Sequence, residues 1–201
     1  MRRHGSIHPR SLVFQLFDWI RGRDQLLIRA GDDLPLIVVS YPSGQQTYAE
    51  ALRTAVCYTY RQLSPETRQR YSHILPRLPS LVVVLLHSRN ACSCLGHYHR
   101  AGTESRVARR LKSDTGLRVG ELDLAVEAIR QWEPLPLASL AAQPPADLRF
   151  HTALLAVFLH ELEHLAFPDH DEHEVRRRST EFYSASLQDF LAQEFGGSYG
   201  I

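Results

Sequence analysis

An uninterrupted apolar run, SLVVVLLHS at residues 80–88, constrains the fold of this chain more than any other stretch. The run has the length of one strand and follows a proline-rich turn. It lacks the alternation of apolar and polar residues that a strand with one solvent-exposed face shows. Because both faces of such a strand must be covered, we expect it to lie centrally in a sheet that is covered on both sides.

Shorter patterns around this run predict an α+β fold in which a mixed sheet packs on helices. Apolar and β-branched runs at residues 25–30 and 35–41 flank the turn-forming residues 31–33, which predicts a hairpin. Further strands are expected at residues 94–100 and 117–126. Helical spacing and capping residues predict helices at residues 11–20, 47–63, 65–75, 104–114, 148–167 and 172–195. A proline-rich connection, residues 133–147, precedes the last two helices.

Composition favours one domain without a membrane span. The chain has 201 residues, of which 44% are hydrophobic and 22% charged, and this is enough for one full core. We therefore expect a single domain over residues 1–201, in which residues 1–90 complete the core and residues 91–201 carry the functional site. The net charge of +1 produces no global field toward nucleic acid or membrane. No apolar stretch approaches the roughly 18 residues of a membrane span.

Cysteine usage and the N-terminal segment predict a cytoplasmic protein. Cys57, Cys92 and Cys94 form an odd number without the spacing of a disulfide framework, so we expect them to be reduced packing residues. The first residues begin basic and turn apolar, but Asp18 interrupts the apolar run and no small-residue cleavage site follows. We therefore expect a core helix there and not a signal peptide.

The segment FLHELEHLAFPDHDEHE, residues 158–174, contains four histidines and six acidic residues at the end of an apolar helical pattern. Residues 160–164 match H-E-x-x-H. On a helix, positions four apart share a face, so His160 and His164 can direct ring nitrogens at one ion about 2.0–2.1 Å away. Glu161 then lies beside the ion as the general base of a metallopeptidase. The alternative is a solvated, charged helix end, but the buried apolar face of the same helix favours the metal site.

A catalytic zinc usually takes three protein ligands and one water, so a third ligand is required. His170 follows His164 after five residues, and Pro168 stops the helix so that the chain can return toward the metal. A carboxylate on the final helix is the alternative, with Glu181 favoured there. The remaining candidates are His173 and Glu174. The residues leave open whether the ion is zinc or another divalent metal.

The residues HELEHL followed by PDHD resemble the signature of the SprT-like, YgjP-like and WLM zinc metallopeptidases. The positions that map onto it are His160, Glu161, His164, His170 and Asp171. The chain departs from that group at Glu174, near a position where those families commonly carry an aromatic residue. Metzincins share the histidine spacing, but Phe167 occupies their glycine position and Met1 is the only methionine, which excludes a Met-turn. IrrE/ImmA-like gluzincins are the rival, because EFYSASLQDFL resembles their glutamate-bearing final helix and makes Glu181 the third ligand.

The resemblance implies a zincin-like fold, a Zn²⁺ cofactor and hydrolysis of peptide bonds in a protein or peptide substrate. In these families a glycine-containing strand and then an edge strand precede the active-site helix, and residues 95–102 and 120–126 match those parts. An extended substrate is then expected to pair with an exposed edge at residues 120–124. His97 and His99 share one face of their strand, so either is a candidate oxyanion donor, although ordinary surface positions are favoured. Tyr183 is expected in the core.

SprT-like and WLM proteins also imply association with proteins bound to DNA. Such a partner would require a local phosphate-binding face, for which Arg106, Arg109 and Arg110 on one helix are the candidates. Near-zero net charge and the lack of a zinc-ribbon cysteine set favour a solvated helix face instead, which leaves nucleic acid weakly supported as a partner. Two other functions stay open: a zinc-stabilised interaction module without catalysis, and a peptidase dedicated to one regulatory protein. Oligomeric state does not follow from the sequence.

Overall fold

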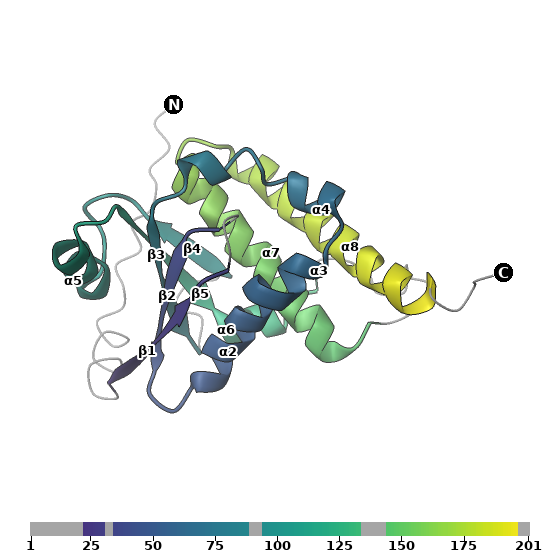
Figure 1. Ribbon diagram of the computed structural model, residues 1–201, viewed down its shortest axis with the longest axis horizontal. Coiled ribbons are helices and arrows are strands. Elements are labelled where there is room, and N and C mark those ends of the chain that lie inside the picture. The colour runs from purple at the N-terminus through teal and green to yellow at the C-terminus, as the bar shows by residue number, and fades with distance from the viewer. Residues whose placement is uncertain (1–21, 31–33, 89–93, 134–143, 197–201) are drawn as a thin grey trace.

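The computed structural model describes residues 22–30, 34–88, 94–133 and 144–196. The fold is α+β, with one mixed five-stranded sheet that carries helices on both faces (Figure 1). The strands are β1 (Arg23–Ile28), β2 (Leu36–Pro42), β3 (Leu81–His87), β4 (Gly96–His99) and β5 (Val119–Ala125), and their order in the sheet is β1-β2-β3-β5-β4. The helix expected at residues 11–20 lies outside the described residues.

Strand β3 is the central strand that the apolar run predicts. It pairs in parallel with β2 on one side and with β5 on the other. Its even-numbered residues from 82 to 86 join the main core, whereas Val83 and Leu85 pack on Ala108 of α5 (Arg106–Thr115). Both faces are therefore covered, which explains why the run shows no polar alternation.

The N-terminal hairpin and the long helix after it are confirmed, with local differences. β1 and β2 pair antiparallel. The expected helix forms as α2 (Gln46–Thr54), the π-helical η1 (Ala55–Thr59) and α3 (Tyr60–Gln62). The next helix, α4 (Pro65–Gln69), is capped by Ser64, whose hydroxyl accepts the N–H of Thr67, but it is shorter than expected. The short elements that the sequence did not predict are η2 (Leu75–Arg77) and α6 (Val126–Arg130).

Two long helices complete the fold and carry the segment of interest. Helix α7 (Ala146–Ala166) packs between the sheet and α8 (Glu172–Gly196), and Figure 1 shows α8 lying along α7. Residues 152–159 of α7 are buried without interruption, because the sheet and α8 cover this helix from different sides. Tyr183 of α8 joins the same core and contacts Trp132, as expected. The turn at residues 167–171 brings the end of α7 next to the start of α8.

The edge strand beside α7 is β4, which corrects the expectation of an exposed edge at residues 120–124. Strand β5 lies between β3 and β4, and β4 runs antiparallel to it. After β4 at the outside of the sheet, α5 carries the chain back so that β5 inserts parallel to β3. The apolar residues Leu122 and Leu124 are fully buried in that interior position, which gives β5 more buried surface than an edge offers.

Two further expectations concern membranes and cysteines. Within the described ranges, no helix has both the length and the apolar character to cross a membrane.

Cys57 is a free thiol, whereas Cys94 is disulfide-bonded, so the expectation of a reduced packing residue at Cys94 is wrong. The spacing of the cysteines excludes only the disulfide frameworks of small secreted domains and is compatible with a single bond.

Candidate metal centre

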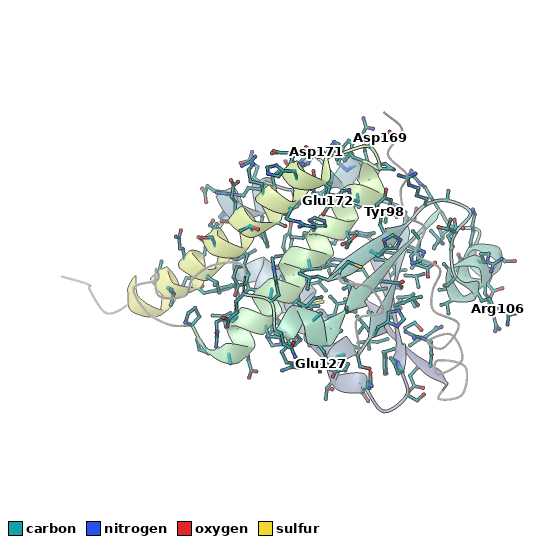
Figure 2. All side chains as sticks on the ribbon, turned by 180° about the vertical axis from the view of Figure 1, so that it is seen from behind. Tyr98, Arg106, Glu127, Asp169, Asp171 and Glu172 are labelled. Atoms are coloured by element: carbon teal, nitrogen blue, oxygen red, sulfur yellow. The ribbon has the colours of Figure 1, made fainter. Side chains whose placement is uncertain are left out.

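Three potential ligands from α7 and α8 converge at the junction of these helices. His160 and His164 lie one turn apart on α7, with ring centroids 4.9 Å from each other. Glu172 at the start of α8 places Oε2 2.9 Å from Nε2 of His164 and 3.8 Å from Nε2 of His160. The three ligand atoms all lie within 4.8 Å of one another. Figure 2 labels Glu172 at this end of α8.

The donor set fits a divalent metal of the zinc type. Two imidazole nitrogens and one carboxylate oxygen are the protein ligands of many catalytic zinc sites, which keep a further position open. The two histidines are largely buried, whereas the side chain of Glu172 is 56% exposed, so the group opens to solvent on one side. The adjacent imidazoles of His160 and His164 lower the pKa of Glu172 far below its ordinary value, which keeps this carboxylate charged.

The ring orientation of His160 is compatible with this role. Its Nδ1 lies 3.4 Å from Oγ of Ser179, and this hydroxyl donates to the backbone carbonyl of Arg176. The Ser179 oxygen therefore accepts from Nδ1–H, which leaves Nε2, the nitrogen on the Glu172 side, as the atom that would ligate a metal. A helix-borne serine thus selects the tautomer that a metal ligand requires.

Glu161 lies beside the ligands without joining them. Its side chain is buried, and burial raises its pKa to about 8, although the backbone N–H of Tyr98 donates to the carboxylate and opposes part of that shift. The carboxylate fits against Gly96 of β4, where a Cβ atom would approach Oε1 to 2.6 Å. A side chain on β4 at this position would occupy the space that Glu161 fills, so glycine is required for the approach.

Tyr98 covers His164 from the sheet edge. The two rings stack with centroids 5.3 Å apart and an interplanar angle of 16°, and Figure 2 shows Tyr98 on the side of the sheet that faces α7. Its hydroxyl lies 3.4 Å from the carbonyl oxygen of Pro168 in the turn before α8. Sequence reasoning did not select Tyr98, Gly96 or Glu172. The alternation of side chains along a strand was the available signal for Tyr98, because it places Tyr98 on the other face of the sheet from His97 and His99.

His170 does not join the group formed by His160, His164 and Glu172. Its Nδ1 lies 2.9 Å from Oε1 of Glu163, and its ring stacks on Phe167 at 4.3 Å. The ligand role of His170 therefore stays a prediction that the arrangement of side chains does not support.

The other proposed third ligands also point elsewhere. Glu181 forms an ion pair with Arg177 on the exposed face of α8. Glu174 pairs with Arg177 and Arg178, and His173 is exposed. The carboxylate from α8 that sequence reasoning considered as an alternative is thus represented here by Glu172, which lies two residues after the expected histidine.

Glu163 is a fully buried acceptor that fixes the turn between the two helices. It receives hydrogen bonds from His170 and from the guanidinium of Arg178, and Nε2 of His73 lies 3.5 Å away. Burial by itself raises the pKa of Glu163, but Arg178 and His170 outweigh burial, and the pKa lies below its ordinary value. The ion pair with Arg178 holds α8 against α7 at the point where Glu172 begins α8.

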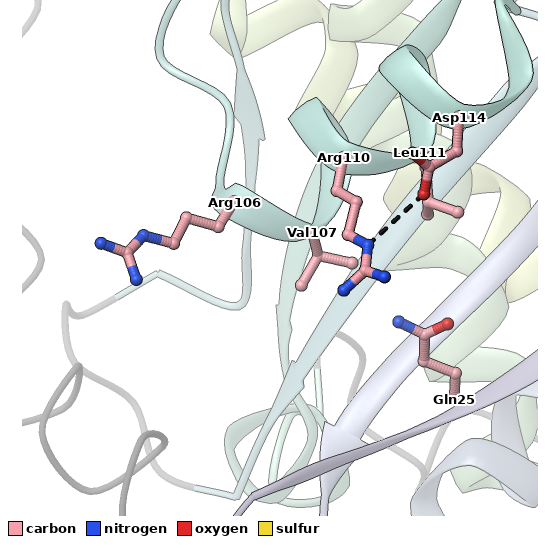
Figure 3. A pocket seen from close by; sticks show the side chains of 6 residues that line it. All are labelled: Gln25, Arg106, Val107, Arg110, Leu111 and Asp114. Carbon is pink, nitrogen blue, oxygen red and sulfur yellow. Dashed lines mark hydrogen bonds and ion pairs between the residues drawn. The ribbon is translucent and has the colours of Figure 1, made fainter.

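The remaining candidates lie on the other face of the sheet. His97 and His99 share a face, as expected, with ring centroids 5.2 Å apart, but it is the α5 face and excludes contact with an oxyanion near His164. Arg106, Arg109 and Arg110 are exposed on α5. A pocket of about 520 Å³ between α5 and β1 is lined by Gln25, Arg106, Val107, Arg110, Leu111 and Asp114, and Arg110 pairs there with Asp114 (Figure 3).

Comparisons of the chain with protein-family profiles, with curated proteins and with solved structures find no match. The functional interpretation therefore depends on the geometry of the site.

Proposed function

We propose that this chain is a zinc-dependent metalloendopeptidase with a zincin-like active site, in which His160, His164 and Glu172 hold the metal. The observation that carries the proposal is the position of the Glu172 carboxylate, which meets both imidazoles on the side that opens to solvent. Three ligands with an open side are typical of catalytic zinc, whereas structural sites are closed by four. The proposed third ligand is Glu172 and not His170, which the sequence led us to expect.

Glu161 is the general base of the proposed reaction. Zinc, when bound, polarises the scissile carbonyl and increases the acidity of a water molecule. The Glu161 carboxylate accepts a proton from the attacking water while the water oxygen bonds to the carbonyl carbon, and it returns that proton to the amine nitrogen as the C–N bond breaks. Burial raises the pKa of the Glu161 carboxyl group, which makes its ionised form a stronger proton acceptor.

An extended polypeptide is the substrate class that the sheet edge supports. Strand β4 ends the sheet beside α7, and its residues Gly96 and Tyr98 contact Glu161 and His164. A substrate strand that pairs with the outer edge of β4 runs past these residues, with main-chain hydrogen bonds that do not depend on substrate sequence. We therefore expect cleavage of unfolded proteins in preference to compact ones.

The test is cleavage of unfolded casein by the zinc-loaded protein and by Glu161→Gln. The variant should retain zinc, because Glu161 is not a ligand, and should lose at least about 100-fold in cleavage rate, because the general base is gone. Glu66→Gln is the matched control. Glu66 is exposed on α4, and the capping residue Ser64 of that helix contacts Asp189 and not the start of α8, so the variant should cleave like wild type. Equal cleavage by wild type and Glu161→Gln would exclude the mechanism.

A zinc-stabilised interaction module is the second candidate, favoured by the origin of the ligands on two helices. A metal held by His160, His164 and Glu172 ties α7 to the start of α8 whether or not it catalyses a reaction. In that case zinc should raise the unfolding temperature of wild type and Glu161→Gln equally, and neither protein should cleave casein. The gluzincin-type alternative, a peptidase for one regulatory protein, gains no support from the exposed pair of Glu181 with Arg177.

A further inference from the structure

A second group of metal-ligating side chains lies on the sheet face opposite α7. Three neighbouring strands contribute to it: His87 ends β3, His99 ends β4, and Glu121 and Asp123 lie two apart on β5. In the ladder His99 is opposite Glu121, and Asp123 is opposite Leu85, which packs toward α5. Strand alternation thus directs the group toward the α5 face, away from the candidate centre on α7.

The distances within the group match those between ligands of one small ion. Nε2 of His99 lies 3.0 Å from Oδ2 of Asp123, and Nε2 of His87 lies 3.5 Å from Oδ1 of the same carboxylate. Ligand atoms of His99, Glu121 and Asp123 all lie within 4.8 Å of one another. Two ligands of a tetrahedral zinc with bonds of about 2.0–2.1 Å are about 3.3–3.4 Å apart, so small side-chain movements suffice to bind an ion.

The group is enclosed and held by its surroundings. Glu121 is fully buried and the side chain of His99 is 8% exposed, whereas His87 and Asp123 are partly exposed at one side. The N–H of Ser105, which caps α5, donates to Oε2 of Glu121 at 2.5 Å and fixes the direction of that carboxylate.

We propose that His87, His99, Glu121 and Asp123 form a second metal site, structural in kind, which binds a divalent ion of the zinc type. His99, Glu121 and Asp123 bring their ligand atoms together, and His87 reaches the same Asp123 carboxylate, so that the protein would supply the fourth ligand, as is typical of structural zinc. The ion would connect the short edge strand β4 to β3 and β5. Because β4 carries Gly96 and Tyr98, the second site would stabilise the strand that contacts Glu161 and His164. This inference does not depend on peptidase activity.

The test is a zinc titration of the metal-free His160→Ala/His164→Ala double variant, which lacks the first centre. We expect one equivalent of zinc per chain and a higher unfolding temperature with zinc than without it. Adding His99→Asn and Asp123→Asn should abolish both effects. His151→Asn in the double-variant background is the control, because His151 lies on α7, on the opposite face of the sheet, and this variant should still bind one equivalent.

Three results would overturn the second site. The first is a folded double variant, judged by circular dichroism, that binds no zinc, which would leave only an ion-pair cluster. The second is binding that survives His99→Asn with Asp123→Asn. If those substitutions unfold the chain, cobalt is bound to the double variant in place of zinc and its absorption spectrum is recorded. A spectrum without imidazole-type ligation would be the third result. None of these readouts uses cleavage, so the second site and the peptidase proposal can fail separately.

Discussion

Gly96 determines how closely strand β4 approaches Glu161. A Cβ atom at this position would lie 2.6 Å from Oε1 and 2.7 Å from Cγ of Glu161. Gly120 is the other described glycine without a left-handed backbone that is tightly packed, and its Cβ would meet Leu165 at 2.4 Å. A substitution at Gly96 therefore disturbs a contact with the proposed base, whereas a substitution at Gly120 disturbs a contact with the hydrophobic core.

Alanine at Gly96 should affect catalysis more than packing. We expect Gly96→Ala to reduce casein cleavage by roughly tenfold or more while zinc content stays at the wild-type level, because a displacement of about 1 Å misplaces the base. Gly120→Ala should instead lower the free energy of unfolding by about 1–3 kcal/mol, as expected for overpacking. Activity assays and urea unfolding of both variants check this, and normal cleavage by Gly96→Ala would contradict the described position of Glu161.

Tyr71 is a buried residue whose hydroxyl has no hydrogen-bond partner among the described residues. Its ring packs edge-on against Phe182 at 5.1 Å. Burial, with a smaller contribution from Glu163, raises the pKa of Tyr71 far above its ordinary value of 10.0. The folded state therefore retains the proton at pH values where the unfolded chain releases it.

The sign of the resulting pH dependence follows from that shift. Stability is complete below the unfolded pKa near 10.0 and falls as pH rises above it, because only the unfolded state gains from ionisation there. Tyr71→Phe should remove this component, so that its unfolding free energy falls less than that of wild type between neutral and strongly alkaline pH. At neutral pH the variant should be equal to wild type or more stable by up to about 1 kcal/mol. An unchanged alkaline slope in urea unfolding would contradict this prediction.

At the scale of elements, the junction between α7 and α8 depends on the buried pair of Glu163 and Arg178. Replacing Arg178 by methionine leaves the Glu163 carboxylate buried with only histidine partners. We expect a loss of about 2–4 kcal/mol in the unfolding free energy of the metal-free protein. Arg177→Met removes only exposed pairs with Glu174 and Glu181 and should cost less than about 1 kcal/mol. Similar losses for the two variants in urea unfolding would show that Glu163 is not an anchor.

The same junction shows where prediction from sequence succeeds and where it fails. Helical spacing correctly predicted one helix that carries His160 and His164, because their relative position is a local property of α7. The residue proposed as third ligand depends on the direction of side chains after Pro168. His170 pairs with Glu163 across the turn, whereas Glu172 faces the histidines. Such a contact is not encoded in local periodicity.

At the scale of the whole molecule, most strands were predictable and their order was not. Apolar runs predicted β2, β3 and β5 because buried strands consist mainly of apolar residues, which are visible in the sequence. The order β3-β5-β4 results from a crossover through α5 between distant segments, and alternation within one strand carries no information about its neighbour. The sheet thereby separates two groups of potential metal ligands, one on the α7 face and one on the α5 face.

The zinc content per chain tests whether His160, His164 and Glu172 form a metal centre. Native mass spectrometry of wild type, Glu172→Ala, His170→Ala and Glu181→Ala, each loaded with zinc and dialysed against metal-free buffer, compares the ligand candidates. We predict that Glu172→Ala binds one equivalent fewer than wild type, whereas His170→Ala and Glu181→Ala bind as many as wild type. A wild-type protein without zinc, or a Glu172→Ala variant that keeps the full complement while His170→Ala loses one equivalent, would contradict this assignment.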